Sequence, residues 1–244
     1  MRTAKTVLTV IQERGKQKKP IERVYKLLFN RELYLNAYAK LYPNNGAMTK
    51  GVTDETVDGM SIQKIDRMIE ILREEKYQWK PARREYIKKK NGKKRPLGIP
   101  VWGDKVLQEV MRQILEAYYE PQFSEHSHGF RPNRGCHTAL QEIQVWKGTR
   151  WFIEGDISQY FDTIDHKILL EILARNIHDG RFIRLVSNML EAGYLEEWKF
   201  NQTISGVPQG GVISPILANI YLNEFDNWIE AVSYTHLRAH ETGR

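Results

Sequence analysis

The 244-residue chain contains a single cysteine, Cys136, so no disulfide bond can form within it. It has no apolar run near the roughly 20 residues that cross a bilayer. The basic N-terminus, Met1 to Lys5, lacks the following apolar stretch of about 7–15 residues that a signal peptide requires. These absences argue against a disulfide-stabilised secreted domain and a helical membrane protein. They predict a soluble, cytoplasmic protein with no membrane partner.

Positive charge is concentrated in the first part of the chain. Residues 1–100 hold 24 Lys/Arg and 11 Asp/Glu, a net charge of +13. Residues 101–244 hold 13 and 19, a net charge of −6, and the two parts together give the total of +7. A strongly basic segment joined to a mildly acidic one indicates a polyanion-binding region beside a carboxylate-bearing region. A soluble protein with an uneven surface charge is the alternative.

Apolar residues repeat at helical spacing along much of the sequence. Ser61 is placed to cap one helix, Asp165 another, and Ser214-Pro215 opens the last, with proline in its favoured first turn. The expected helices are 21–42 with a break near Asn30, 62–72, 104–119, 138–146, 166–173, 182–190 and 214–229.

Residues 84–99 have the pattern of a β-hairpin, because Asn91-Gly92 accepts the positive φ angles of a tight two-residue turn. Residues 80–95 contain nine Lys/Arg and one Glu. So many like charges on one hairpin favour a nucleic-acid partner, with a solvated basic loop as the alternative. Further strands are expected at Trp151-Phe152-Ile153, which reads as buried, at 198–201 and at 203–204.

Two polar features follow expected strands. Asp156 comes just after Trp151-Phe152-Ile153, and carboxylates at strand ends suit Mg²⁺, which prefers oxygen ligands. A turn or cap aspartate is the alternative. The loop 206–211 is rich in proline and glycine, and its Gln209 offers both a donor and an acceptor to a nucleotide. A purely structural turn is the alternative there.

Four sequence blocks occur in order and together resemble the fingers and palm blocks of group II intron-encoded reverse transcriptases. They are Lys93-Lys94-Arg95-Pro96-Leu97-Gly98-Ile99-Pro100, His128-Gly129-Phe130-Arg131-Pro132-Asn133-Arg134, Gly155-Asp156 through Phe161-Asp162, and Gly206-Val207-Pro208-Gln209-Gly210 through Ser214-Pro215. The resemblance extends over roughly residues 25–231. A retron, diversity-generating or CRISPR-linked reverse transcriptase is the alternative within the same class of enzyme.

The resemblance implies an α+β fold with right-hand polymerase fingers and a partial palm. The fingers would be rich in helices and carry the basic β-hairpin, and the antiparallel palm sheet would be incomplete. The expected parts are a basic N-terminal extension and start of the fingers at 1–80, fingers at 81–150, a partial palm at 151–231 and a tail at 232–244.

The resemblance also implies a role for each matching residue. Asp156 would be the first metal-binding aspartate, with the Ile157 carbonyl as a further ligand of a two-Mg²⁺ site. Phe161 would exclude a ribose 2′-hydroxyl, although a core phenylalanine fits its position equally well. The other nucleotide-binding residues would be Lys93, Arg95, Gln209 and Gly210. The nucleic-acid-binding residues would be Lys88, Lys89, Lys90, Arg131 and Arg134, of which Arg131 and Arg134 either contact the template backbone or brace the fingers.

The partners implied are an intron RNA template, a DNA primer and dNTPs, with a maturase role in intron splicing and mobility. The family's palm needs two more carboxylates in a Tyr-Ala-Asp-Asp-type turn, yet no Asp-Asp pair occurs, and Asp226 lies in a helical pattern. The chain by itself is therefore predicted to be inactive. Residues 232–244 depart from the family and are similar to translated cloning sequence, with a natural divergent tail as the alternative. His126, His128, Cys136 and His137 match no zinc-binding spacing.

Overall fold

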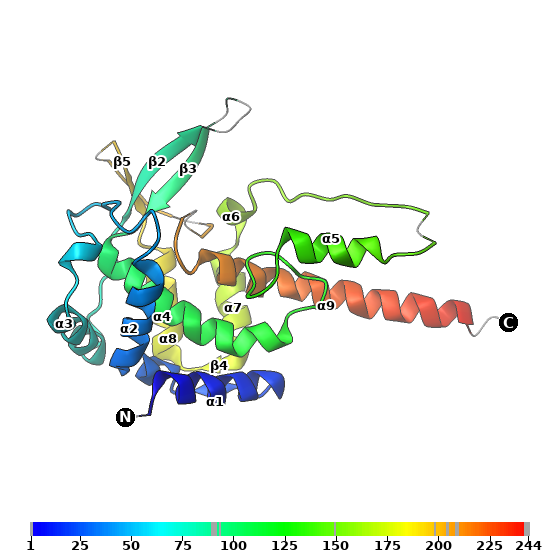
Figure 1. The fold of residues 1–244 in the computed structure, drawn as a ribbon, viewed down its shortest axis with the longest axis horizontal. Helices are drawn as coiled ribbons and strands as arrows, with labels where there is room; N and C mark the ends of the chain where they lie inside the picture. The colour runs from blue at the N-terminus through cyan, green and yellow to red at the C-terminus, as the bar shows by residue number, and fades with distance from the viewer. Residues whose placement is uncertain are drawn as a thin grey trace.

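The computed structural model describes residues 2–88, 92, 94–148, 150–197, 199–203, 205–207 and 210–241, with side chains as far as Val232. Helices form most of the molecule (Figure 1). Their bounds are α1 Ala4–Lys16, α2 Arg31–Leu41, α3 Ile62–Arg73, α4 Trp102–Tyr119, α5 Cys136–Gln144, α6 Tyr160–Thr163, α7 His166–Asn176, α8 Gly180–Leu190 and α9 Ser214–Glu241, with short 3-10 helices η1 Val24–Phe29, η2 Val57–Gly59 and η3 Glu120–Gln122. No described helix is long and apolar enough to cross a bilayer.

The described strands form two small sheets. β1 (Ile21–Glu22) pairs in parallel with β4 (Ile177–His178). The larger sheet has the order β3-β2-β5-β6, with β2 at Ala82–Lys88, β3 at Lys94–Ile99, β5 at Tyr194–Glu196 and β6 at Lys199–Asn201. Two of its pairings are antiparallel, and β2 pairs with β5 in parallel. The expected mixture of helices with a small sheet is confirmed.

Helix α4 is the centre of the core, and α1, α2 and α9 contact it. Figure 1 shows α4 crossing the middle of the molecule above α1. Its apolar face is fully buried along the whole helix, at Val106, Leu107, Val110, Met111, Ile114, Leu115 and Tyr118. Burying a large aliphatic or aromatic side chain contributes about 1.5–3 kcal/mol, so this one helix supplies much of the stabilisation of the core.

The predicted helices are present, with shifts at their ends. The Ser61 side chain accepts a hydrogen bond from the Lys64 amide, and that of Asp165 accepts one from the Ile168 amide, so both predicted caps are confirmed. The chain does break at Asn30, whose side chain caps α2. The stretch before it was predicted as helix and is instead β1 and η1, because Arg23 takes a left-handed conformation with φ of 55°.

Helix α1 was not predicted. Its buried face consists of Ala4, Ile11 and Gly15, which is too sparse in large apolar side chains to produce a periodic pattern. Gly15 permits close packing on α4, since a Cβ atom there would lie 2.1 Å from the Tyr118 carbonyl oxygen. The helix therefore depends on backbone proximity that the sequence pattern does not reveal.

The prediction of a buried strand at Trp151-Phe152-Ile153 is wrong. These side chains are 86%, 68% and 94% exposed, and the segment forms no strand. In Figure 1 it is part of an extended trace that runs beside α5, away from the body of the molecule. A strand needs a hydrogen-bonded neighbour, and within the described ranges none pairs with this segment.

The predicted hairpin is confirmed, but its predicted turn is not. Lys88 pairs with Lys94 and Ile87 with Arg95, whereas a two-residue turn at Asn91-Gly92 would pair Lys88 with Arg95. The described register of the two strands therefore differs from the one that a two-residue turn sets. Gly92 has φ of 79°, and Asn91 lies outside the described residues.

Candidate functional site

Two of the four sequence blocks are joined by the backbone. The Val207 amide donates a hydrogen bond to the Phe161 carbonyl over 2.7 Å, and the Gly206 amide donates to the Ile164 carbonyl over 2.8 Å. The His166 ring lies 2.6 Å from the Gly206 carbonyl oxygen through Nε2, which donates to it. The segment after Asp156 and the glycine-rich loop therefore form one rigid unit.

Gly206 is required by this arrangement. Its φ of 88° lies in the left-handed region, and a Cβ atom would lie 2.7 Å from the Phe161 carbonyl oxygen and 2.8 Å from the Cα of Asp162. Any other residue would strain the backbone and collide with α6.

The glycine-rich loop also contacts the hairpin. A Cβ atom on Gly210, which has φ of 106°, would lie 2.6 Å from Leu97 Cδ1 and 2.7 Å from the Gly98 carbonyl oxygen. Gln108 of α4, only 4% exposed, accepts a hydrogen bond from the Val212 amide over 2.9 Å. Gly210 is thus pressed against β3. Gln209, the expected nucleotide contact, lies outside the described residues.

The block of residues 128–134 also contacts Phe161. The Phe130 ring is edge-on to the Phe161 ring, with centroids 6.4 Å apart, and Phe130 is 71% exposed. Asn219 of α9 donates a hydrogen bond to the Gly129 carbonyl over 2.8 Å. Phe161 is half-buried and packs against the core. Segments from all four blocks, far apart in sequence, therefore converge around Phe161 and Gly210.

The hairpin presents two different faces. Alternation along β3 places Arg95 on the same face as Leu97, the side that meets Gly210. Lys88 and Lys94 lie on the opposite face. That face also carries Arg84 and Gly98, which line a pocket together with Gly206 and Val207. The glycine-rich loop therefore meets both faces of the hairpin. Lys89, Lys90 and Lys93 lie outside the described residues.

Arg131 is held inside the protein. Its side chain is 4% exposed and forms an ion pair with Glu120 at 2.9 Å. Its Nη1 donates to the carbonyls of both Ser124 and Ser127, and its guanidinium carbon lies 5.3 Å from the Phe123 ring centre. Of the two roles expected for Arg131, these contacts support bracing. Arg134 is half-buried and donates to the Glu125 carbonyl.

The histidines of this loop bond to a carboxylate. Glu142 of α5 contacts His126 Nδ1 at 2.5 Å and His128 Nε2 at 2.8 Å. These hydrogen bonds lower the pKa of the Glu142 carboxyl. They attach α5 to the loop that carries Phe130.

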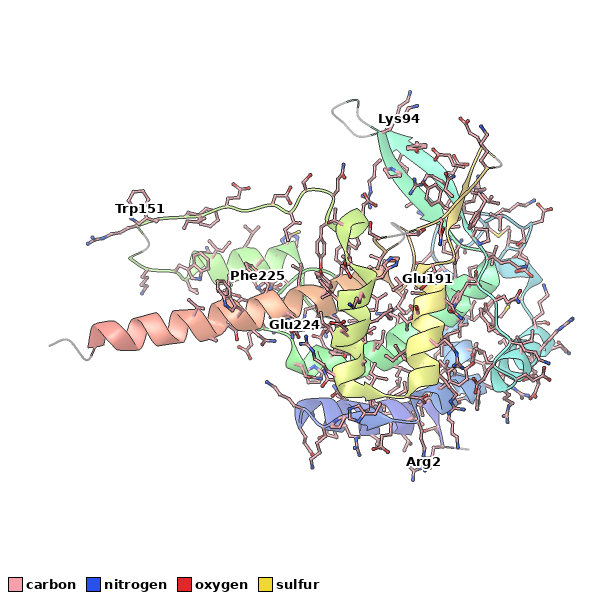
Figure 2. The ribbon with its side chains drawn as sticks, turned by 180° about the vertical axis from the view of Figure 1, so that it is seen from behind. Arg2, Lys94, Trp151, Glu191, Glu224 and Phe225 are labelled. Carbon is pink, nitrogen blue, oxygen red and sulfur yellow. The ribbon has the colours of Figure 1, made fainter. Side chains whose placement is uncertain are left out.

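Asp156 stands apart from this unit. It is exposed, on the extended segment that also carries Ile157, and no hydrogen bond or ion pair holds it within the described part of the chain. Figure 2 labels Trp151 on the same segment, far from Lys94 at the end of the hairpin. No group of three or more His, Cys, Asp or Glu residues among those described could hold a metal ion.

The residues present do not complete a magnesium site. Asp156 and the Ile157 carbonyl supply one carboxylate and one carbonyl, whereas Mg²⁺ takes an octahedral shell that is usually built from one or two carboxylates, water and substrate phosphates. Asp226 lies on α9, and burial and the nearby Glu230 raise the pKa of its carboxyl. No metal-dependent step follows from these residues alone.

Three residues of the site were not predicted: Gln108, Phe130 and His166. Gln108 could have been noticed in the sequence, because it is a polar residue next to the apolar positions of an amphipathic helix. Phe130 lies within the second block, but the resemblance implies no role for it. No sequence signal points to His166, whose contact with Gly206 depends on the tertiary fold.

The chain matches the family model described as reverse transcriptase (RNA-dependent DNA polymerase) over residues 87–238. It is 51% identical over 209 residues to the group II intron-encoded protein LtrA of Lactococcus lactis, covering 85% of this chain and 35% of LtrA. It is 40% identical to the protein YkfC of Escherichia coli, covering 86% of this chain and 57% of YkfC.

A solved chain from a partial Cas6-RT-Cas1–Cas2 complex has a similar fold, with a TM-score of 0.55 at 20% identity, over 85% of this chain and 35% of that one. The likeness extends to the fold alone. The present chain spans about a third of the length of LtrA. From the family match and the intron-encoded relatives, the chain belongs to the reverse transcriptase family, in its group II intron-encoded branch.

Proposed function

We propose that the chain is the fingers and first palm portion of an RNA-directed DNA polymerase that also binds its intron RNA as a maturase in the cytoplasm. The observation that supports this most is the convergence of the four blocks around Phe161 and Gly210. Polymerases of this type need a rigid platform for the incoming nucleotide, and fixed positioning supplies much of the catalysis in phosphoryl transfer.

Each residue near this platform has a proposed role. Arg95 shares the face of Leu97, which contacts Gly210, and its cation would attract the triphosphate of a dNTP. Phe161 would limit space at the ribose 2′ position, next to the exposed ring of Phe130. Asp156 would supply one carboxylate toward a two-Mg²⁺ site, in which bound metal would provide activation of the primer hydroxyl.

The chain alone is proposed to be inactive, because a single carboxylate cannot hold two metal ions. Primer extension with an RNA template, a DNA primer, dNTPs and Mg²⁺ tests this, and template-dependent incorporation above background would contradict it. Reading the gene beyond codon 231 tests the polymerase role itself. An in-frame Tyr-Ala-Asp-Asp-type turn supports it, and an uninterrupted frame without such a turn contradicts it.

The maturase role is favoured by the net charge of +13 on residues 1–100. Binding to a labelled group II intron RNA should weaken steeply with salt, since each neutralised phosphate releases counterions. Equal affinity for the intron and for an unrelated RNA of the same length would argue against a specific maturase.

A further inference from the structure

A cavity of about 530 Å³ is lined by α3, by the segments before and after it, and by the first turn of α4. Figure 1 shows α3 at the end of the molecule away from α5. None of the described residues that line the cavity belongs to the four sequence blocks, although Trp102 also lines a smaller hollow beside Leu97 and Gly210. The larger volume is that of a small-molecule site, and neither proposed role uses it.

The less exposed part of the lining is largely apolar. Val101 and Trp102 are buried, and Met60, Met68 and Ile71 are half-buried. Methionine side chains are unbranched and polarisable, so they adapt to the shape of an apolar group placed against them. These five side chains can therefore pack against a flat apolar body.

The exposed part of the lining is basic. It contains four exposed cations, Lys64, Arg67, Lys76 and Lys80. Lys64 lies 3.9 Å from Glu55, and Lys76 lies 3.0 Å from Glu74. Among the residues that the structure describes, no carboxylate lies within 4 Å of the side-chain nitrogens of Arg67 or Lys80. Two positive charges beside the cavity are therefore without a close counter-ion.

The two carboxylates of the lining already have donors. Asp104 is 2% exposed and accepts hydrogen bonds from the Tyr77 hydroxyl over 2.6 Å and the Lys80 amide over 3.0 Å. Glu55 has the lysine contact given above. By contrast, Trp102 Nε1 is a buried donor with no acceptor among the described residues. What the lining lacks is a negative charge and a hydrogen-bond acceptor, not a cation.

We infer that this cavity binds a small organic carboxylate with a flat apolar body. The Arg67 guanidinium matches a carboxylate with two parallel hydrogen bonds, and the Lys80 ammonium adds a second charge. A cationic ligand would meet four like charges, and an uncharged one would leave both free cations unpaired. Such a carboxylate would join α3 to the segment that leads into β2 at Ala82.

The test titrates the whole chain with naphthalene-1-carboxylate by isothermal titration calorimetry. Naphthalene-1-carboxamide, which has nearly the same shape and no charge, is the matched ligand. The carboxylate should bind at one site, and the amide at least about tenfold more weakly, because hydrogen bonds to a charged group are stronger. The carboxylate should also raise the midpoint of thermal unfolding, since it binds the folded state. Equal affinities, or no binding of the carboxylate, would overturn the proposal.

Arg67→Gln tests the recognition of charge. It should weaken binding of naphthalene-1-carboxylate by roughly tenfold and leave binding of the amide nearly unchanged. Arg73→Gln is the matched control, because Arg73 is also on α3 but stacks on Phe29 and does not line the cavity. An equal loss of affinity in the two variants would contradict the role given to Arg67.

Gly103→Leu tests the location. A Cβ atom at this position would lie 3.4 Å from Met68 Cε and 3.9 Å from Glu55 Oε2, so a larger side chain would occupy the cavity. Leucine is a better helix former than glycine, and circular dichroism should confirm that α4 is retained.

Gly103→Leu should abolish binding of naphthalene-1-carboxylate, whereas Gly103→Ala, which adds one methyl group, should keep most of it. Unchanged binding in a folded Gly103→Leu variant would place the carboxylate elsewhere and refute the proposal. That result would leave the polymerase and maturase proposals unaffected, because neither depends on this cavity.

Discussion

The backbone amide of Val207 donates a hydrogen bond to the carbonyl of Phe161 over 2.7 Å, which fixes the glycine-rich loop against the segment that follows Asp156. The bond is possible only because Gly206 takes a φ of 88° beside α6. The two segments are thereby joined by the fold itself, independently of any ligand.

Gly206→Ala should lower the free energy of unfolding by at least about 2 kcal/mol, through positive-φ strain and contact with the Phe161 carbonyl. Chemical denaturation measures it. Gly46→Ala is the matched control, because no heavy atom lies within 4 Å of a Cβ there, and it should change stability by less than about 1 kcal/mol. Equal effects of the two substitutions would contradict the role given to Gly206.

Arg131→Met should destabilise the protein by roughly 3 kcal/mol, because it leaves the half-buried Glu120 carboxylate and two carbonyls without their donor. Affinity for RNA, measured on the folded fraction, should stay the same. Arg150→Met removes an exposed arginine as the control. Unchanged stability with weakened RNA binding would instead make Arg131 a template contact.

Glu109 and Arg112 of α4 form a buried ion pair, in which Arg112 Nε lies 2.7 Å from Glu109 Oε2. The Arg112 side chain is 13% exposed and that of Glu109 is 1% exposed. Arg112→Met should cost about 3–5 kcal/mol, because it leaves a buried charge without its principal partner. Glu109→Met/Arg112→Met should recover most of that loss in denaturant titrations. Lys50→Met, which breaks an exposed pair with Asp54, should cost less than about 1 kcal/mol.

If the double variant is no more stable than Arg112→Met, the loss comes from packing of the arginine stem and not from the unpaired carboxylate. That outcome would contradict the electrostatic account of this pair.

Asp104 should make stability depend on pH. Burial raises the pKa of its carboxyl to about 6, although the Tyr77 hydroxyl and the Lys80 amide donate to it. Between about pH 4 and 6 the folded state binds this proton more tightly than the unfolded state. The contribution of Asp104 to unfolding free energy therefore falls as pH rises through this window, by about 2–3 kcal/mol.

Denaturation at a series of pH values measures this effect as the difference between the unaltered chain and Asp104→Asn, whose side chain does not titrate. The difference should change across pH 4–6 and level off above it. Asp58→Asn alters an exposed aspartate and serves as the control. A flat difference for Asp104→Asn would show that the carboxyl titrates normally in the folded state.

Local sequence determined most of the helices and several of their starts, although α1 was missed. The caps Ser61 and Asp165 and the fully apolar face of α4 depend on residues within a few positions of one another, so spacing alone predicted them. The hairpin strands were also local. Its register, with Lys88 opposite Lys94, differed from the one that the Asn91-Gly92 turn predicted.

Residues whose roles depend on distant partners were decided by the tertiary structure. The buried contacts of Arg131 come from Glu120 and two carbonyls of the loop before it, and position 206 requires glycine because α6 lies against it. Trp151-Phe152-Ile153 had the composition of a buried strand but has no hydrogen-bonded neighbour in the described part of the chain. Sequence thus set the family, most of the helices and the candidate residues. Tertiary contacts set which of those residues meet, because burial and pairing need partners that spacing does not specify.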